Sequence, residues 1–332
     1  MSQFMSGEDL RSWLGNLAQE RSLIAPTRSD GLLLFGAISR AEEIALDYDN
    51  TLLSPKGHLF LATDTLFTIE RKEGDIELVP ASVEGEAAIF GIRPCDALGL
   101  RVLDKPFLAE PADALYQQRR ARTALIGLSC HKASPECFCT SLGTGPDDPS
   151  HVDILLTGAG EGYIVQAVTE RGKALLATAP LVEAEVTPPP APSPTPVPTE
   201  DIAEVASSVF DAPYWARLAD RCIHCNLCAY VCPVCYCFDI RDHSYMGRME
   251  RMRTWESCQS PGFSRIAGGY EPRDTKGARL RQRFYHKLLY MPEQFGVIGC
   301  TGCGRCVTSC PVNIDIREVI SEMQRLGVSG AS

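Results

Sequence analysis

The chain has 332 residues, enough for two domains with cores of their own. Its apolar fraction of 45% and charged fraction of 22% are ordinary for a globular protein, and its net charge of −10 argues against a general nucleic-acid binder. The sequence holds no run of about 18 apolar residues and no signal-peptide core at its N-terminus, so we expect no transmembrane segment and a cytoplasmic location.

Residues 1–186 predict an α/β-type domain. The N-terminal residues predict a helix capped by Ser6, with acidic residues in its first turn. Residues 67–79 predict a hairpin that turns at Glu73–Gly74, and residues 94–104 predict a helix with proline in its first turn. Short apolar runs predict strands at 31–38, 86–92, 123–128 and 152–157. Alternating strands and helices indicate a mixed layer structure.

A proline run divides the chain. Residues 188–198 contain seven prolines, which lack the backbone N–H and fix φ. We therefore expect residues 187–200 to be an extended linker without helix or inner strand.

Residues 201–332 predict an all-helical domain, which makes the whole chain an α+β protein. Residues 244–257 and 275–290 have helical character. Between residues 239 and 288 there are eleven Lys and Arg residues against six Asp and Glu. This local excess indicates a solvated helix face or, alternatively, a docking surface or a charge screen beside anionic groups.

The cysteine pattern carries the chemistry. The sequence has fifteen cysteines, and in a reducing cytosol thiolates more often hold metal than form disulfides. Two runs with the spacing C-x2-C-x2-C-x3-C-P contain most of the clustered thiols. The first run consists of Cys222, Cys225, Cys228 and Cys232, and the second consists of Cys300, Cys303, Cys306 and Cys310.

This spacing is the bacterial ferredoxin pattern for [4Fe–4S] clusters, in which the fourth cysteine ligates the other cluster. We therefore assign one cluster to Cys222, Cys225, Cys228 and Cys310. We assign the second to Cys300, Cys303, Cys306 and Cys232. A pair of zinc sites is the alternative, although zinc sites usually use paired C-x2-C steps.

His224 lies inside the first run and is expected to face solvent or a sulfur rather than to be a ligand. Gly299, Gly302 and Gly304 would let backbone N–H groups approach the sulfurs of the second.

Four further cysteines suggest a third [4Fe–4S] cluster in the N-terminal domain. Cys95 and Cys130 each follow a predicted strand, where sites in α/β domains gather, and Cys137 and Cys139 are held together by a C-x-C step. Zinc binding and plain buried thiols are the alternatives. Arg93 and Arg101 could balance the charge of such a cluster.

Cys235, Cys237 and Cys258 remain. Because they are only three, a complete cubane would need a borrowed ligand. We expect them to pack near the first cluster, with a further cluster as the alternative.

Several segments together resemble one family. The sequences GIRPCDALGLRVLD, CFCTSLGTGP, CPVCYCFD, WESCQ, AGGYEPRDTKGARLRQRFYHKLLY and GCTGCGRCVTSCPVNIDI occur in this order. They are similar to the β, iron–sulfur subunit of sulfhydrogenase-type nickel–iron hydrogenases and to the A subunit of anaerobic sulfite reductase. The long insert between the runs also resembles the helical iron–sulfur domains of succinate dehydrogenase and heterodisulfide reductase. The resemblance covers residues 54–319, and the proline-rich linker departs from it.

The resemblance implies an electron-transfer subunit of a cytosolic multisubunit oxidoreductase. Such a subunit lies between a flavin- and NAD(P)-binding reductase subunit and a catalytic metal subunit of the hydrogenase or sulfite-reductase type. The sequence has no dinucleotide fingerprint, Walker motif or nucleophile elbow, so we expect no catalytic site of its own. The alternatives are a redox sensor and a scaffold with structural clusters.

Overall fold

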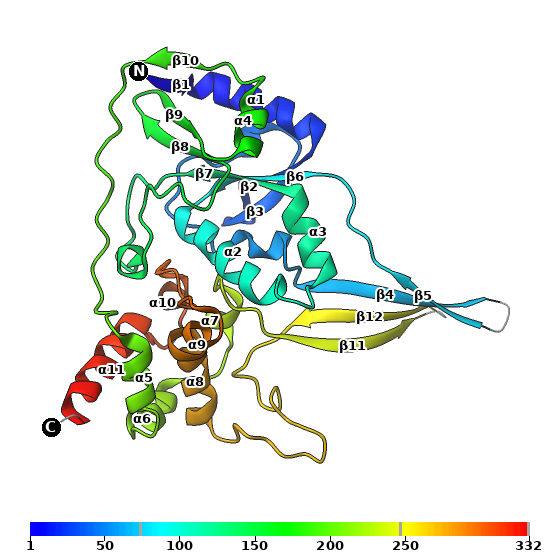
Figure 1. Cartoon of the computed structure of the whole chain (residues 1–332), viewed down its shortest axis with the longest axis vertical. Coiled ribbons are helices and arrows are strands. Elements are labelled where there is room, and N and C mark those ends of the chain that lie inside the picture. The colour runs from blue at the N-terminus through cyan, green and yellow to red at the C-terminus, as the bar shows by residue number, and fades with distance from the viewer. Residues whose placement is uncertain (73–74, 246–247, 331–332) are drawn as a thin grey trace.

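The computed structural model describes residues 1–72, 75–245 and 248–330 (Figure 1). Its strands are β1 Ser2–Ser6, β2 Ser22–Ser29, β3 Leu32–Ile38, β4 Thr63–Lys72, β5 Asp75–Pro80, β6 Ala87–Ile92, β7 Thr123–Leu128, β8 Ile154–Ala159, β9 Gly162–Ala167, β10 Val182–Ala184, β11 Phe238–Tyr245 and β12 Arg248–Trp255. Its α-helices are α1 Gly7–Glu20, α2 Pro94–Phe107, α3 Ala114–Arg122, α4 Glu170–Leu176, α5 Ile202–Ser208, α6 Tyr214–Arg221, α7 Leu227–Tyr230, α8 Lys276–Tyr285, α9 Met291–Phe295, α10 Arg305–Thr308 and α11 Ile316–Gly330. Four short helical segments are η1 Ala41–Glu43, η2 Pro55–His58, η3 Cys139–Leu142 and η4 His286–Tyr290.

The N-terminal part is built on an eight-stranded sheet in the order β10-β1-β9-β8-β7-β6-β2-β3. Its centre is parallel, because β2, β6, β7 and β8 run side by side in the same direction. The other pairs in this sheet are antiparallel. The predicted strands and the predicted helix in residues 94–104 are confirmed, and Ser6 caps α1 by accepting a hydrogen bond from the N–H of Asp9.

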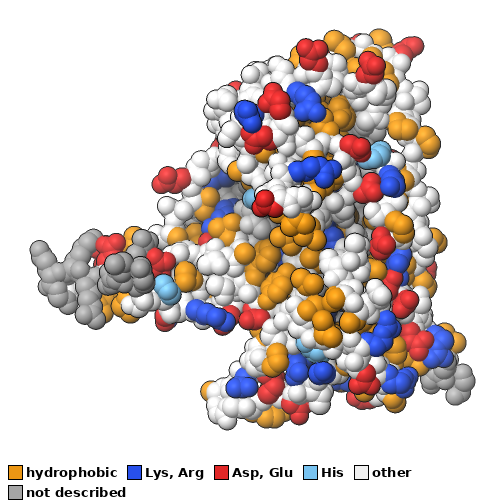
Figure 2. Space-filling model, turned by 180° about the vertical axis from the view of Figure 1, so that it is seen from behind, with side chains coloured by type: hydrophobic (Ala, Val, Ile, Leu, Met, Phe, Trp, Pro, Cys, Tyr) orange, Lys and Arg blue, Asp and Glu red, His pale blue; other side chains and the backbone are white. Residues whose placement is uncertain are grey.

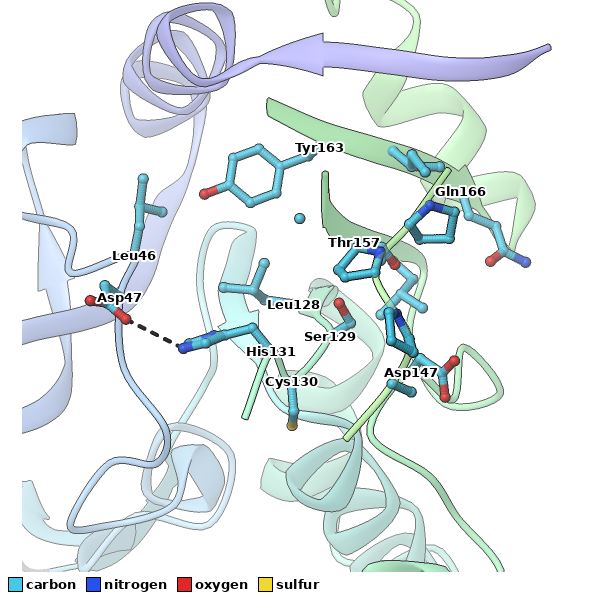
Figure 3. A pocket seen from close by; sticks show the side chains of 17 residues that line it. Leu46, Asp47, Leu128, Ser129, Cys130, His131, Asp147, Thr157, Tyr163 and Gln166 are labelled. Carbon is cyan, nitrogen blue, oxygen red and sulfur yellow. Dashed lines mark ion pairs between the residues drawn. The ribbon is translucent and has the colours of Figure 1, made fainter. Parts of the chain in front are cut away.

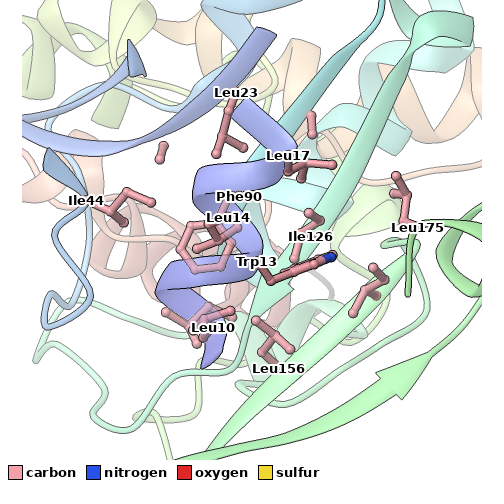
Figure 4. Packing of buried hydrophobic residues seen from close by; sticks show 14 of the residues in the cluster. Leu10, Trp13, Leu14, Leu17, Leu23, Ile44, Phe90, Ile126, Leu156 and Leu175 are labelled. Atoms are coloured by element: carbon pink, nitrogen blue, oxygen red, sulfur yellow. The ribbon is translucent and has the colours of Figure 1, made fainter. Parts of the chain in front are cut away.

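Both faces of this sheet are buried, which gives three layers. Successive strand residues alternate between two cores: Phe90 and Ile126 face α1, whereas Ile89 and Leu125 face α2. Figure 4 shows the side chains of α1 packed on Phe90, Ile126 and Leu156. The parallel centre is therefore covered by helices on both sides, as predicted for an α/β-type domain.

A second, four-stranded sheet extends away from this body in the order β11-β12-β4-β5 (Figure 1). The predicted hairpin in residues 67–79 is confirmed as β4 and β5, although its turn at 73–74 lies outside the described residues. Strands β11 and β12 form a second hairpin, and β12 pairs with β4. This sheet joins the two predicted domains, because it takes one hairpin from each side of the proline run.

The prediction of helix for residues 244–257 is therefore wrong, and the C-terminal part is not all-helical. Its Met, Arg and Glu residues have good helix propensity. In the structure, the available edge of β4 and the burial of Arg253 against Asp64 favour a strand instead. Local propensity is a weak preference that tertiary contacts override.

The remaining C-terminal elements are mainly helical and share one core. Helices α5, α6, α8 and α11 bury apolar side chains against each other, among them Trp215, Phe284 and Ile320. The predicted helix over 275–290 is confirmed as α8 followed by the π-helical segment η4. Among the described residues, none of the helices is both long and apolar enough to span a bilayer.

The proline-rich linker has no helix or strand in residues 187–199, as predicted. The linker is nevertheless hydrogen-bonded to the N-terminal part. The N–H of Val197 donates to Ser141 Oγ at 2.8 Å, and the Thr199 hydroxyl donates to the carbonyl of Ser141 at 2.6 Å. The linker therefore runs along the molecule from β10 to α5 (Figure 1).

Candidate iron–sulfur sites

The cysteines of the two ferredoxin runs are brought together in two adjoining cavities. Cys222, Cys225 and Cys228 of the first run line one cavity together with Cys310 of the second. Cys300, Cys303 and Cys306 of the second run line the other together with Cys232 of the first. Each cavity thus contains three thiols of one run and the fourth of the other, and Cys306 of the second run lines the first cavity as well.

The chain turns tightly within both runs. His224, Asn226 and Asn313 have positive φ, and so do Gly302 and Gly304. At Gly302 an added Cβ would lie 2.5 Å from the backbone nitrogen of Cys139, so only glycine fits at this contact between the second run and the N-terminal part. The glycine therefore allows close approach of two backbones, in addition to the predicted approach of its N–H to the Cys300 sulfur.

Several sulfurs in these cavities accept hydrogen bonds. The side-chain amide of Gln259 donates to Cys228 Sγ at 3.1 Å, and the N–H of Ile314 donates to Cys310 Sγ at 3.2 Å. In the other cavity, Lys287 Nζ donates to Cys232 Sγ at 3.2 Å. Such donors stabilise thiolate ligands and raise the reduction potential of a bound cluster. His224 also lines the first cavity, and its ring contacts the carbonyl of Gln259 at 3.3 Å.

Buried cations surround the second cavity. Arg283 and Lys287 are 4% and 3% exposed and line it, and Arg283 also lines the first. Within the described part of the chain, neither forms an ion pair with a carboxylate. An unpaired buried charge is costly, and thiolates are the anions that these two cations face. A cluster held by four thiolates is an anion, so this donor set fits it.

The thiols respond to this environment in two ways. Burial raises the pKa of Cys303 to about 11 and that of Cys306 to about 12, so both would be protonated without a metal. A hydrogen bond from Cys235 lowers the pKa of Cys232, with further help from Lys287 and against the effect of burial. Metal binding would displace the remaining protons.

The four N-terminal cysteines also lie near one another. Cys95 begins α2 and Cys130 follows β7, so both stand at the carboxyl edge of neighbouring parallel strands, as predicted. Cys130 interacts electrostatically with Cys95 and Cys137, and Cys139 interacts with Cys130. Burial raises the pKa of Cys130 to about 11 and that of Cys139 to about 12.

Two arginines, Arg93 and Arg101, were predicted to balance the charge of this group, and only Arg93 lies beside it. Arg93 is 1% exposed and donates to the carbonyls of Leu128 and Ser129 beside Cys130. Its charge lowers the Cys130 pKa, although burial has the larger, opposite effect. Arg101 is exposed on α2 and is not part of this environment.

A cavity of about 460 Å³ adjoins Cys130 (Figure 3). It is lined by Leu128, Tyr163 and Thr157, and the linker residues 188–191 form part of its wall. His131 lies 3.4 Å from Asp47 at its rim. The linker thus contacts the neighbourhood of the N-terminal cysteines.

A buried ion pair links the N-terminal cysteines to the second cavity. Arg305 contacts Asp96 through two hydrogen bonds of 2.5 and 2.8 Å and donates to Thr51. These residues neighbour Cys95 and Cys306 in sequence, and the charge of Cys303 acts on Cys95. This ion pair therefore fixes the position of the N-terminal cysteines relative to the second cavity.

The burial of these cations was not predicted from the sequence. The excess of Lys and Arg in residues 239–288 was a signal, because Arg253, Arg279, Arg283 and Lys287 from this segment are buried. Others, such as Arg241 and Arg251, are exposed and pair with carboxylates. Figure 2 shows charges of both signs spread over one face of the molecule rather than one basic patch. For Arg283 and Lys287 the interpretation as a charge screen fits best.

Cys235, Cys237 and Cys258 lie together beside Cys232. A hydrogen bond from Cys258 lowers the pKa of Cys237 to about 7, and Cys235 is hydrogen-bonded to Cys232. Among the described residues, no three Cys, His, Asp or Glu side chains are close enough to share a single metal ion. The ligand sulfurs of a cubane bind four separate irons and are therefore further apart than those around one ion.

Residues 221–314 match the family model of the 4Fe-4S dicluster domain. The chain is an iron–sulfur protein. It is also similar to sulfhydrogenase 2 subunit beta of Pyrococcus furiosus, with 28% identity over 96% of this chain and 97% of the relative. These findings confirm the resemblance to sulfhydrogenase β subunits, and the domain model supports two 4Fe-4S clusters. No solved structure matches the chain.

Proposed function

We propose that this iron–sulfur protein is the electron-transfer subunit of a multisubunit oxidoreductase, without a catalytic site of its own. It would carry electrons between a flavin- and NAD(P)-binding reductase subunit and a catalytic metal subunit of the hydrogenase or sulfite-reductase type. The similarity to a sulfhydrogenase subunit supports such a complex. The many unpaired thiols support a location in the reducing cytoplasm.

The observation that carries the proposal is the crossed arrangement of the two runs. We propose that Cys222, Cys225, Cys228 and Cys310 hold one [4Fe–4S] cluster. We propose that Cys300, Cys303, Cys306 and Cys232 hold the other. Arg283 and Cys306 line both cavities, so the two centres would be direct neighbours. A [4Fe–4S] cluster accepts and passes on one electron at a time.

The protein's own residues would set the direction and ease of transfer. Gln259 and Lys287 donate to ligand sulfurs, and Lys287 and Arg283 bring positive charge into a dry environment. Both effects stabilise the reduced, more negative state of a centre. The residues around the second cavity would therefore raise the reduction potential of a cluster bound there.

We further propose that Cys95, Cys130, Cys137 and Cys139 hold a third [4Fe–4S] cluster. Their mutual proximity and the charge of Arg93 support it. The Asp96–Arg305 ion pair would keep it at a constant distance from the second ferredoxin centre. The chain would then connect the two C-terminal centres with a partner that docks on the α/β body.

Reductive titration of the native complex, followed by EPR, tests the function. We expect the ferredoxin centres to be reduced within the physiological range of potentials. If every centre resisted reduction throughout that range, the clusters would be structural and the electron-transfer role would be wrong. Mass spectrometry of the proteins that co-purify with the native chain identifies the partner subunits.

A further inference from the structure

The hairpin of β11 and β12 brings together three cysteines that belong to none of the sites above. Cys237 directly precedes β11 and Cys258 lies three residues after the end of β12. Phe238 pairs with Trp255 in the ladder, and the N–H of Glu256 donates to the carbonyl of Cys237 at 2.9 Å. The open end of the hairpin, where β11 begins and β12 ends, therefore holds Cys258 beside Cys237, and the two thiols influence each other's pKa.

Cys235 completes this group, which we call the hairpin thiols. It lies two residues before Cys237 and interacts electrostatically with both Cys237 and Cys258. None of the hairpin thiols lines either described ferredoxin cavity. Their connection to the second cavity is the contact between Cys235 and Cys232.

A buried cation faces the hairpin thiols. Lys56 in η2 is 2% exposed, and its Nζ donates to the carbonyl of Cys235 at 2.7 Å and lies 4.4 Å from the centre of the Trp255 ring. Within the described ranges of the chain it forms no ion pair with a carboxylate, and its electrostatic attraction is to cysteines 232, 235 and 237. Burial disfavours such a charge unless an anion compensates it.

Lys56 faces the hairpin thiols as well as Cys232, and three thiols beside a buried cation fit an anionic metal centre better than three neutral thiols. We propose that Cys235, Cys237 and Cys258 ligate a further iron–sulfur cluster, separate from the two ferredoxin centres and from the N-terminal one. Each thiol would lose its proton on binding iron. Because Cys232 belongs to the second ferredoxin set, one iron of this cluster would have no cysteine ligand. Such an iron is lost first on mild oxidation, which converts a [4Fe–4S] cluster to a [3Fe–4S] cluster.

Iron analysis of the anaerobically purified native complex tests the proposal. Cys258→Ser should contain about four irons fewer per chain than the wild type, while the EPR signals of the ferredoxin centres remain. It should also lack a [3Fe–4S] signal that the wild type develops on mild oxidation. Ser257→Ala is the matched control, because it changes the neighbouring buried residue and should keep the full iron content. Equal iron in the wild type and Cys258→Ser would overturn the proposal.

Alkylation of the wild-type complex provides a test that does not depend on the folding of a variant. Cys235 and Cys237 are only partly buried, so burial alone does not protect them. We expect both to resist iodoacetamide in the iron-loaded protein and to react after iron is chelated, as mapped by mass spectrometry. Free reaction in the iron-loaded protein, or a Cys237–Cys258 disulfide in the anaerobic sample, would refute iron ligation. Intact ferredoxin EPR signals in that same sample would show that the proposed function survives.

Discussion

The two ferredoxin cavities differ in their surroundings although their sequence motifs are the same. The first cavity opens toward solvent: Cys225 is exposed, and Ile223 and Leu227 beside it are 61% and 41% exposed. The second lies inside the molecule between α2, η4 and the loop before η3, where Pro233 and Gly302 make close backbone contacts. It contains Lys287 in addition to Arg283, which lines both cavities, whereas the first has the side-chain amide of Gln259 at Cys228.

The two sites therefore differ in the surrounding structure and not in the spacing of their cysteines. Burial, charge and hydrogen bonds to sulfur are the main means by which a protein sets the potential of a cluster. The first site has the exposed surface through which a partner could exchange electrons. The Asp96–Arg305 ion pair connects the second to the N-terminal cysteines, so under the proposed function it would pass electrons inward.

We call the second ferredoxin site the inner site and the first the outer site. The largest expected effect on stability comes from breaking the contact between the inner site and the N-terminal part. Asp96→Asn leaves the charge of Arg305 buried without a partner, which should lower the free energy of unfolding by about 3–5 kcal/mol. Anaerobic denaturant unfolding measures the change. Asp242→Asn removes an ion pair on the exposed hairpin and should leave the unfolding midpoint unchanged. Equal stability of the two variants would show that the contact between the two parts is unimportant.

The next largest effect is expected on the reduction potential of the inner centre. Lys287→Met removes a buried charge whose Nζ lies 3.2 Å from Cys232 Sγ, and its loss should cost an electron on that centre about 2 kcal/mol at an effective dielectric constant near 20, or roughly 90 mV. The potential of the inner centre should fall by this amount and that of the outer centre by much less. An EPR-monitored redox titration measures both. A shift confined to the outer centre would contradict the assignment of Lys287 to the inner one.

A smaller shift is expected at the outer site. Gln259→Leu removes the hydrogen bond to Cys228 Sγ, worth about 1 kcal/mol, and should lower the potential of that centre by roughly 40 mV. The same titration provides the measurement, with the inner centre as an internal reference. A lower potential at the inner centre alone would reverse the two assignments.

The sequence predicts the crossed grouping of the ferredoxin cysteines because both runs match one known spacing pattern, and the ligand sets remain a prediction. Cys95 and Cys130 were likewise predictable, since each follows a buried strand and the two strands are neighbours in a parallel sheet. The hairpin thiols were not, because β11 and β12 carry residues with helix propensity and depend on pairing with β4, far away in sequence.

The buried cations were unpredictable for a related reason. Lys56 and Lys287 come from segments more than two hundred residues apart and meet only through the packing of η2 and η4 around Cys232 and Cys235. The sequence shows a local excess of positive charge but does not say which members of it are buried. Only the tertiary fold separates Lys287, at a ligand sulfur, from Arg251, on an exposed strand.

The smallest effect is expected from cutting the linker. A protease site inserted after Ser193 should produce two fragments that stay associated and keep their iron, because β12 pairs with β4 and Arg305 pairs with Asp96 across the cut. Gel filtration of the cleaved protein under native conditions measures this. Separation into two independently folded fragments would instead support the simple spacer that the proline run suggests.

Crossed ligation is the central claim, and one EPR comparison tests it most directly. Cys225→Ala and Cys303→Ala serve as references, because each removes a proposed ligand that lines only one of the two ferredoxin cavities. We predict that the spectrum of reduced Cys310→Ala reproduces that of Cys225→Ala, since Cys310 lines the cavity of the first run. A spectrum that matches Cys303→Ala instead would mean that each run holds its own cluster, and would contradict the account.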